Sequence, residues 1–279
     1  MRFVVRHQTL YRYNVPVVLA PHVLRLTPRA TENRIWARSL LVRPDPVQLS
    51  EQQDSFGNAI TRLAFPNAPT DELRIDSRLE LDTLAPPLLG PETLPLLPWA
   101  APASDGLAPY LPAVAADPGV ASFARAVAAE AGDGAVPFLD HLCRTMHARS
   151  DRRIRHTGDA QTAAETLASW QGACRDLTVL FMAAARSLGM AARFCSGYQA
   201  AADTPTGQRY LHAWPEVFIP GSGWRGWDPT HGVRVGEGHV ALCAAPEQAA
   251  TMPVDGAYYF GRSITATLDF EVTIATSSQ

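Results

Sequence analysis

Polar and apolar residues alternate over the first part of the chain. The alternation is clearest from His7 to Tyr13, and the same two-residue period returns at 35–42 and 73–81. Such a period places successive side chains on opposite faces of a half-buried strand. Between two of these runs, residues 54–58 have the Asp, Gly and Asn content of a hairpin turn. Residues 1–85 are therefore predicted to form an antiparallel unit of short β-strands.

Proline sets off the next stretch, from 86 to 118, where it recurs too often for a regular helix. Proline also lacks the backbone donor that a central strand needs. We therefore expect a linker over 86–118, and its apolar content predicts that it lies along the protein surface instead of hanging free. The side chains expected to hold it there are Leu88, Leu89, Leu96, Leu97, Trp99 and Tyr110.

A helical period replaces the alternation after residue 118. It predicts helices over 120–131, 137–149, 162–170 and 174–188, the last of which ends at Gly189. Strands are predicted at 191–199, 210–219 and 224–228, and the alternation of 263–275 predicts a return to a sheet. Residues 119–279 thus form the predicted core, which makes the chain an α+β protein with an N-terminal antiparallel β unit.

Composition narrows the function classes. Hydrophobic residues make up 47% and charged residues 18% of the chain, as in globular proteins. The formal net charge of −3 gives no reason to expect a nucleic-acid partner or an acidic membrane surface. The densest basic run, residues 151–155, contains an acid and is interpreted as a solvated loop. No apolar stretch approaches the roughly 18 residues of a spanning helix, so no membrane segment is expected.

The chain contains four cysteines, at 143, 174, 195 and 243, which show neither C-x-x-C spacing nor a dense framework. The start of the chain lacks the apolar region of an export signal, so we expect a cytoplasmic protein with free thiols. Cys143 and His147 are four residues apart on one predicted helix with His141 nearby, but a zinc site needs three or four ligands. Core packing is the preferred interpretation, and neither a metal nor a cofactor is expected.

Cys174 differs from the other thiols in its place at the start of a predicted helix. The helix N-terminus has unpaired N–H groups and a partial positive charge, which favour the thiolate that nucleophilic attack requires. Gly172 lets a substrate approach the backbone, and the N–H of Cys174 is placed to bind an oxyanion. Taken alone, a free cysteine is more often a small buried residue, so its catalytic partners have to be found.

The partners of a nucleophilic thiolate are a histidine base and a group that orients it. His212 lies in a predicted strand, a turn follows at 220–223, and Asp228 ends the next strand. The two side chains meet only if they share one face of this hairpin. Pairing of residue 219 with 223 makes them diagonal neighbours, about 7–8 Å apart at the backbone. An even-length loop with regular pairing separates them, so the hypothesis requires an odd-length loop or a bulge.

Four motifs follow one another through the predicted core. They are GACRD at 172–176, SGY at 196–198, HAWPEV at 212–217 and GWRGWDPT at 223–230, and together they resemble the bacterial transglutaminase-like family. HQTLYRY at 7–13 and DSFGN at 54–58 are similar to the β-region that precedes this core in many bacterial members. The resemblance implies a papain-like core, in which the active-site helix packs on an antiparallel sheet, and a catalytic triad of Cys174, His212 and Asp228.

Four further side chains are candidates for the cleft around this triad. Trp170 and Gln171 precede the cysteine and are candidate donors to the oxyanion, and Tyr198 has the same standing. Trp214, like Trp224 and Trp227, is expected in the core or in the cleft wall, and at least one of the three should border the substrate groove; a buried indole also needs a polar partner. After the cysteine, this chain has Arg-Asp-Leu-Thr-Val at 175–179 where the bacterial branch of the family usually has Gln-Asp-Phe-Ala-His, so the substrate preference of relatives is not carried over.

The triad predicts a covalent reaction in which Cys174 attacks an amide or other acyl carbonyl and forms a thioester. Water then gives hydrolysis, whereas an amine gives transamidation, and the same triad serves both. Hydrolysis of a protein or peptide amide is the preferred hypothesis, because water is always present and no amine site is evident. Transfer to an amine, amide formation from an activated thioester and a non-catalytic binding module on the same fold stay open, as does the oligomeric state.

Overall fold

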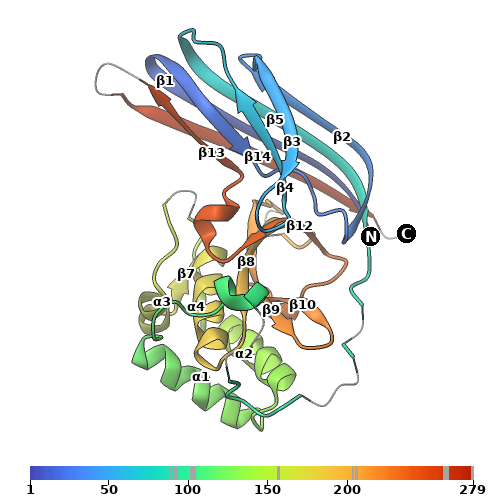
Figure 1. Cartoon of the computed structure of the whole chain (residues 1–279), viewed down its shortest axis with the longest axis vertical. Helices are drawn as coiled ribbons and strands as arrows, with labels where there is room; N and C mark the ends of the chain where they lie inside the picture. The colour runs from blue at the N-terminus through green and yellow to red at the C-terminus, as the bar shows by residue number, and fades with distance from the viewer. Residues whose placement is uncertain are drawn as a thin grey trace.

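Two antiparallel sheets packed against each other organise the chain, and helices cover the second of them (Figure 1). The computed structural model describes residues 1–87, 89–90, 94–100, 105–155, 158–202, 204, 207–259 and 264–277. The N-terminal strands form the first sheet, and the second belongs to the predicted core. The α+β class, the N-terminal β unit and the helix packed on an antiparallel sheet are confirmed.

The first sheet is built from both ends of the chain. Its strand order is β2-β5-β1-β4-β3, with β13 and β14 also paired to β1. The strands are β1 (Arg2–Leu24), β2 (Asn33–Arg43), β3 (Gln48–Gln53), β4 (Ala59–Ala64), β5 (Thr70–Thr83), β13 (Val254–Tyr259) and β14 (Ala266–Ser277).

Strand β1 is the centre of this sheet and runs in one piece, where the sequence predicts short strands. Its first half lies between β5 and β14, with Val5 opposite both Leu79 and Ile274, and its second half pairs with β13 and β4. Pairing along both edges supports the strand over its whole length. β14 confirms the expected return of the C-terminal alternation to a sheet, although residue 263 lies outside the described residues. Residues 254–259 and 266–277 therefore belong to the first sheet, although they fall within the range 119–279 expected to form the core.

The turn at 54–58 joins β3 to β4, as the sequence predicts. Asp54 shapes it, because its Oδ1 accepts the backbone N–H groups of Phe56 and Asn58 at 2.8 and 2.9 Å. The side chain of Asn58 then exchanges two hydrogen bonds with the backbone of Ala244 in the second sheet. The hairpin thereby fixes one edge of the first sheet on the core.

The proline-rich stretch lies along the core in its described parts. Leu97 and Tyr110 are buried, and Leu89 and Trp99 pack partly against the helices. These contacts agree with a linker that apolar side chains hold to the surface. Leu96 is 66% exposed and takes no part, and Leu88 lies outside the described residues.

The second sheet has the strand order β11-β10-β9-β8-β12. Its strands are β8 (Ala192–Gln199), β9 (His212–Ile219), β10 (Gly223–Asp228), β11 (Val233–Arg234) and β12 (His239–Ala245), and β6 (Asp151–Arg152) and β7 (Gln171–Gly172) form a separate parallel pair. The helices are α1 (Pro118–Glu130), α2 (Ala135–Arg149), α3 (Ala163–Ser169) and α4 (Cys174–Ser187), with short 3-10 turns η1 (Asp105–Tyr110) and η2 (Gln248–Thr251). No described helix combines the length and the apolar character needed to cross a membrane.

Helix α4 lies at the centre of the core, between the other helices and strands β8 and β9. Leu177, Leu180 and Phe181 are fully buried at helical spacing and fill this space. The helix ends as predicted before Gly189, which has a φ of +84° and where a Cβ would lie 2.1 Å from the carbonyl oxygen of Trp99. This packing holds the first residue of α4 beside the beginning of β9.

Gly197 in β8 is a second place without room for a side chain. A Cβ there would lie 2.1 Å from the carbonyl oxygen of Val240 and 2.6 Å from Cη2 of Trp214. We expect Gly197→Ala to lower the free energy of unfolding by about 3 kcal/mol, because both the strand and the buried indole resist displacement. Urea denaturation followed by circular dichroism measures the loss. Gly236→Ala is the control, since a Cβ at 236 meets nothing within 4 Å, and an equal loss in both variants would contradict the packing argument.

Candidate active site

Cys174 is the first residue of α4, and its side chain is partly exposed. The helix begins here because the buried carboxylate of Asp176 accepts the backbone N–H of Ala173 at 2.7 Å. An acidic group in the first turn also suits the helix dipole. The thiol therefore lies at the positive end of the helix, where the sequence predicts it.

The other three cysteines are buried. Burial raises the pKa of Cys143 and of Cys243 to about 12, and it raises the pKa of Cys195 well above its ordinary value. Because the thiolate is the nucleophile, these thiols are poor candidates for attack at neutral pH. Cys174 is the thiol that a substrate can reach.

The hairpin of β9 and β10 has the register that the sequence hypothesis requires. Residue 219 pairs with 223 and residue 216 with 226, so the loop 220–222 has an odd length. His212 and Asp228 consequently share one face. Nε2 of His212 lies 2.9 Å from Oδ2 of Asp228, and the two side chains are 1% and 0% exposed.

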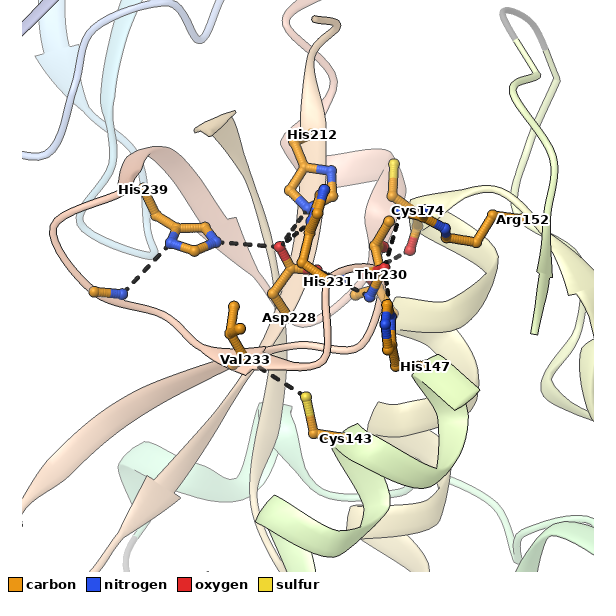
Figure 2. A network of polar contacts seen from close by, with 12 residues as sticks. Cys143, His147, Arg152, Cys174, His212, Asp228, Thr230, His231, Val233 and His239 are labelled. Atoms are coloured by element: carbon orange, nitrogen blue, oxygen red, sulfur yellow. Dashed lines mark hydrogen bonds and ion pairs between the residues drawn. The ribbon is translucent and has the colours of Figure 1, made fainter. Parts of the chain in front are cut away.

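Cys174 lies beside the ring of His212 (Figure 2) and favours its charged form. Since Asp228 engages Nε2 of the ring, the nitrogen that remains for the thiol is Nδ1. Burial disfavours the charged imidazole, but the charge and hydrogen bond of Asp228, together with Cys174, raise the pKa of His212 well above 6.5. The imidazolium is therefore the favoured form at neutral pH, and it can pair with a thiolate.

Asp228 is the centre of a network that contains three histidines (Figure 2). Besides His212, His231 reaches the same oxygen through Nδ1 at 2.8 Å and His239 through Nε2 at 3.1 Å. The backbone N–H groups of Thr230 and His231 donate to the other oxygen at 2.9 and 3.2 Å. Burial by itself would raise the pKa of Asp228, but the charge of His212 and the three histidine hydrogen bonds hold it well below 3.8. An ionised carboxylate only accepts, so each of the three ring nitrogens carries a hydrogen.

His231 and His239 are candidates that the sequence pattern does not single out. The available signal for His231 is its position three residues after Asp228, within the turn that the aspartate begins. His239 opens β12, which pairs with β8, so only the tertiary structure brings it to the aspartate. Both residues form hydrogen bonds with the Asp228 carboxylate, which in turn orients His212.

The same cluster could hold a metal ion, because the ligand atoms of His212, Asp228 and His231 lie within 4.8 Å of one another. In the structure hydrogen bonds join these atoms. The other pair considered from the sequence does not converge. Cys143 donates to the carbonyl of Val233 at 3.5 Å, whereas Nδ1 of His147 lies 2.9 Å from the carbonyl oxygen of Thr230.

A cavity of about 360 Å³ lies at Cys174 and His212. The first sheet contributes one wall through residues 7–11 of β1 and residues 268–270 of β14. Residues 152–155 and Arg175 contribute another; residues 151–154 are exposed, in agreement with the interpretation of this run as solvated, but its arginines also line the cavity. The parallel pairing of β6 with β7, just before the cysteine, brings these arginines to the site.

The four further cleft candidates do not line this cavity. Tyr198 is fully buried with its hydroxyl 2.9 Å from Nδ1 of His7, and Trp214 is buried beside a separate cavity that His239 also lines. Both lie on strands packed on two faces, which an alternation pattern does not resolve. Trp170 ends α3 in the left-handed conformation and packs on Phe123, while the side chain of Gln171 faces solvent.

Comparisons with known proteins agree with the fold and the order of the motifs. Residues 3–82 match the bacterial transglutaminase-like N-terminal region, and residues 121–229 match the transglutaminase-like superfamily. An uncharacterized protein of Mycobacterium tuberculosis is 28% identical over 280 residues, which cover 92% of this chain and 88% of that protein. An uncharacterized protein of Mycobacterium leprae is 25% identical, over 98% of this chain and 97% of its own.

A solved structure shares the fold. The crystal structure of a candidate cysteine protease from Cytophaga hutchinsonii superimposes with a TM-score of 0.70 at 19% sequence identity. The superposition covers 100% of this chain and 92% of the other, so it includes the first sheet as well as the core. The chain belongs to the transglutaminase-like superfamily and carries the N-terminal region found in its bacterial members.

Proposed function

We propose that the protein is a cysteine-dependent amide hydrolase that acts on a protein or peptide through a thioester acyl-enzyme. One observation carries the proposal. A partly exposed thiol at a helix start contacts His212, whose far nitrogen is bonded to the buried, ionised Asp228. This is the order of nucleophile, base and orienting acid that thiol-dependent acyl transfer needs. Membership of the transglutaminase-like superfamily and the fold shared with a candidate cysteine protease support it.

In the proposed acylation, Sγ of Cys174 forms a bond to the amide carbonyl carbon. The carbonyl oxygen takes up the negative charge, and the backbone N–H of Cys174 is the proposed donor to it, since Asp176 already engages the N–H of Ala173. His212 then gives its Nδ1 proton to the departing nitrogen as the carbon–nitrogen bond breaks. An amine leaves, and the acyl group stays on sulfur as a thioester.

Water completes the cycle. His212, now neutral, takes a proton from the water that attacks the thioester carbon, and the carbon–sulfur bond breaks. The carboxylic acid leaves, and the thiolate and imidazolium are restored. Asp228 holds the ring through Nε2 in both steps and stabilises the charged form. A cytoplasmic location belongs to the same proposal, because all four cysteines are unpaired and a reducing compartment keeps the nucleophile free.

Alkylation by iodoacetamide at neutral pH tests whether the thiol is activated. We expect fast modification confined to Cys174, because burial protects the other three thiols. His212→Ala should lower the rate at Cys174 by about tenfold or more, since the imidazolium no longer stabilises the thiolate. Peptide mapping after timed quenching measures each site. Slow and equal modification of all four thiols would support a non-catalytic binding module instead.

A casein or glutamine-peptide substrate, incubated with and without a primary amine, separates hydrolysis from transfer. Hydrolysis predicts release of ammonia or a peptide amine with no incorporation of the added amine. The protein's own side chains do not compete with the added amine, because its 24 Lys and Arg positions are all arginine and no lysine is present as an acceptor. Stoichiometric incorporation of the amine would instead establish a transamidase, the second outcome of the same acyl-enzyme.

A further inference from the structure

The cavity at Cys174 carries charge of one sign. Four arginines line it, at 152, 153, 155 and 175, and no carboxylate occurs among its described lining residues. The chain as a whole has a formal net charge of −3, so the positive charge at the cavity is opposite in sign to the charge of the whole protein. A cleft lined by one sign of charge concentrates ligands of the other sign.

Carboxylates outside the lining compensate part of this charge. Arg155 donates through Nη2 to the buried Asp176 at 2.6 Å, and this pair ties residues 151–155 to the start of α4. Arg153 pairs with Asp151, but both side chains are more than half exposed, so solvent weakens the pairing. The guanidinium of Arg155 is therefore mostly engaged by Asp176, whereas that of Arg153 can exchange its exposed partner for a ligand.

Each of the other two arginines donates a hydrogen bond to a backbone carbonyl. Arg152 donates to the carbonyl of Thr230 at 3.1 Å, and Arg175 donates to that of Arg155 at 2.8 Å. A carbonyl orients a guanidinium without cancelling its unit charge. These hydrogen bonds hold both guanidinium groups at the site.

Arg175 follows the nucleophile directly, and its surroundings disfavour its charge. Burial lowers the pKa of Arg175 and the neighbouring Arg155 lowers it further, whereas Asp176, Cys174 and Asp159 raise it by less. A bound anion would favour the charged guanidinium and offset this cost. The site is therefore more complementary to an anionic ligand than to a neutral one.

The walls from other elements have a different character. Tyr11 and Phe270 of the first sheet offer rings, and Leu268 and Met252 offer aliphatic surface. A ligand that suits the whole cavity has an aliphatic body and an anionic group on the arginine side. Pockets of this kind use a few polar groups to orient a ligand that apolar walls enclose.

We propose that the substrate carries a carboxylate a few bonds from the scissile carbonyl, as a glutamyl or aspartyl residue does, and that Arg152, Arg153 and Arg175 select it. This inference rests on the proposed function of Cys174 and names its substrate class, acidic peptides and amides. Guanidinium groups suit the assignment, because they bind carboxylates in a fixed geometry with two donors.

Two alkylating reagents that differ only in charge test the selection. Iodoacetate carries a carboxylate where iodoacetamide carries an amide, and both modify a reactive thiol. At Cys174 we expect the ratio of the two rate constants, iodoacetate over iodoacetamide, to exceed that of a small neutral thiol by about tenfold. The ratio should fall as salt is added, because ions screen the arginines.

Arg175→Gln and Arg153→Gln should each lower this ratio by about threefold or more. Arg153 serves as a second test because its side chain is 60% exposed, so its loss leaves the packing intact. Arg62→Gln is the matched control, since this exposed arginine of β4 does not line the cavity. An unchanged ratio in both cavity variants would overturn the proposal while the activated thiol stands.

Binding to Cys174→Ala tests the charge without any chemistry at sulfur. Titration calorimetry with glutarate and with glutaramide should show tighter binding of the dianion by about tenfold, and this preference should be lost in Arg175→Gln and Arg153→Gln made on the same background. Equal binding of the two compounds would overturn the inference. If instead all thiols alkylate slowly and glutarate still binds, the proposed catalysis fails and the anion site stands.

Discussion

Replacing Cys174 with alanine is expected to lower the turnover of a peptide amide by at least about 10⁴-fold, because water must then attack the amide without a covalent intermediate. Neither His212 nor Asp228 is expected to rescue the reaction, since no nucleophile remains for the base to activate. The fold should survive, because the thiol is partly exposed and its loss leaves little empty volume. Steady-state rates per folded molecule, with urea denaturation alongside, measure both effects.

Cys243→Ala is the matched control for this variant. Cys243 is a buried thiol between the two sheets, so its loss should cost about 1 kcal/mol of stability and leave the rate per folded molecule unchanged. A Cys174→Ala protein that keeps wild-type turnover would refute covalent catalysis at this residue. A similar loss of rate in both variants would show that the effect is structural.

Replacing Asp228 with asparagine is the second large change, and we expect it to lower turnover by about 10³-fold. The amide cannot stabilise the imidazolium, and its NH₂ group meets ring nitrogens that now donate to the carboxylate. His212 then loses both its orientation and its raised pKa. The descending limb of the activity profile, which reports loss of the His212 proton, should move to lower pH in the variant.

The same variant makes a prediction about stability. The pKa of His212 is raised by Asp228, so its stabilising contribution is complete below 6.5 and is lost as the pH rises through the raised value. The pKa of Asp228 is lowered, so its contribution is complete above 3.8 and is lost as the pH falls through the lowered value. The difference in unfolding free energy between wild type and Asp228→Asn should therefore be largest between about pH 4 and 6.5 and shrink on either side.

Asp255→Asn controls for the loss of a carboxylate, because Asp255 is exposed, pairs with Arg25 and does not line the cavity. It should change neither the activity profile nor the pH dependence of unfolding beyond about 0.5 kcal/mol. A pH-independent stability difference for Asp228→Asn would contradict the ion pair, even if turnover were lost.

Patterns among residues close together in the chain were enough to predict the elements that carry Cys174, His212 and Asp228. The helical period of 174–188 placed the start of α4 at Cys174, and the hairpin hypothesis set a condition on loop length that the pairing of 219 with 223 meets. The turn at 54–58 was likewise predictable, because Asp54 supplies its own hydrogen bonds. Each of these features depends on residues close together in the chain.

Features that depend on distant segments were not predictable. Every residue of β8 is buried, so an alternation pattern gives no sign that Tyr198 faces the first sheet and not the cleft. The ion pair of Arg155 with Asp176 was not predictable, because the aspartate lies beyond a loop and a further helix. His239 reaches Asp228 only through the pairing of β12 with β8.

The pairing of β1 with β14 has a consequence for biosynthesis. Phe3 is synthesised well before its partner Thr276, because β14 is the last strand of this sheet in chain order. Until then one edge of β1 has no strand beside it, and an open edge invites pairing with other chains. The wall of the cavity that Phe270 supplies is missing over the same period. A nascent chain thus cannot assemble the complete cavity, and the proposed acyl transfer would have to wait until this sheet has been translated.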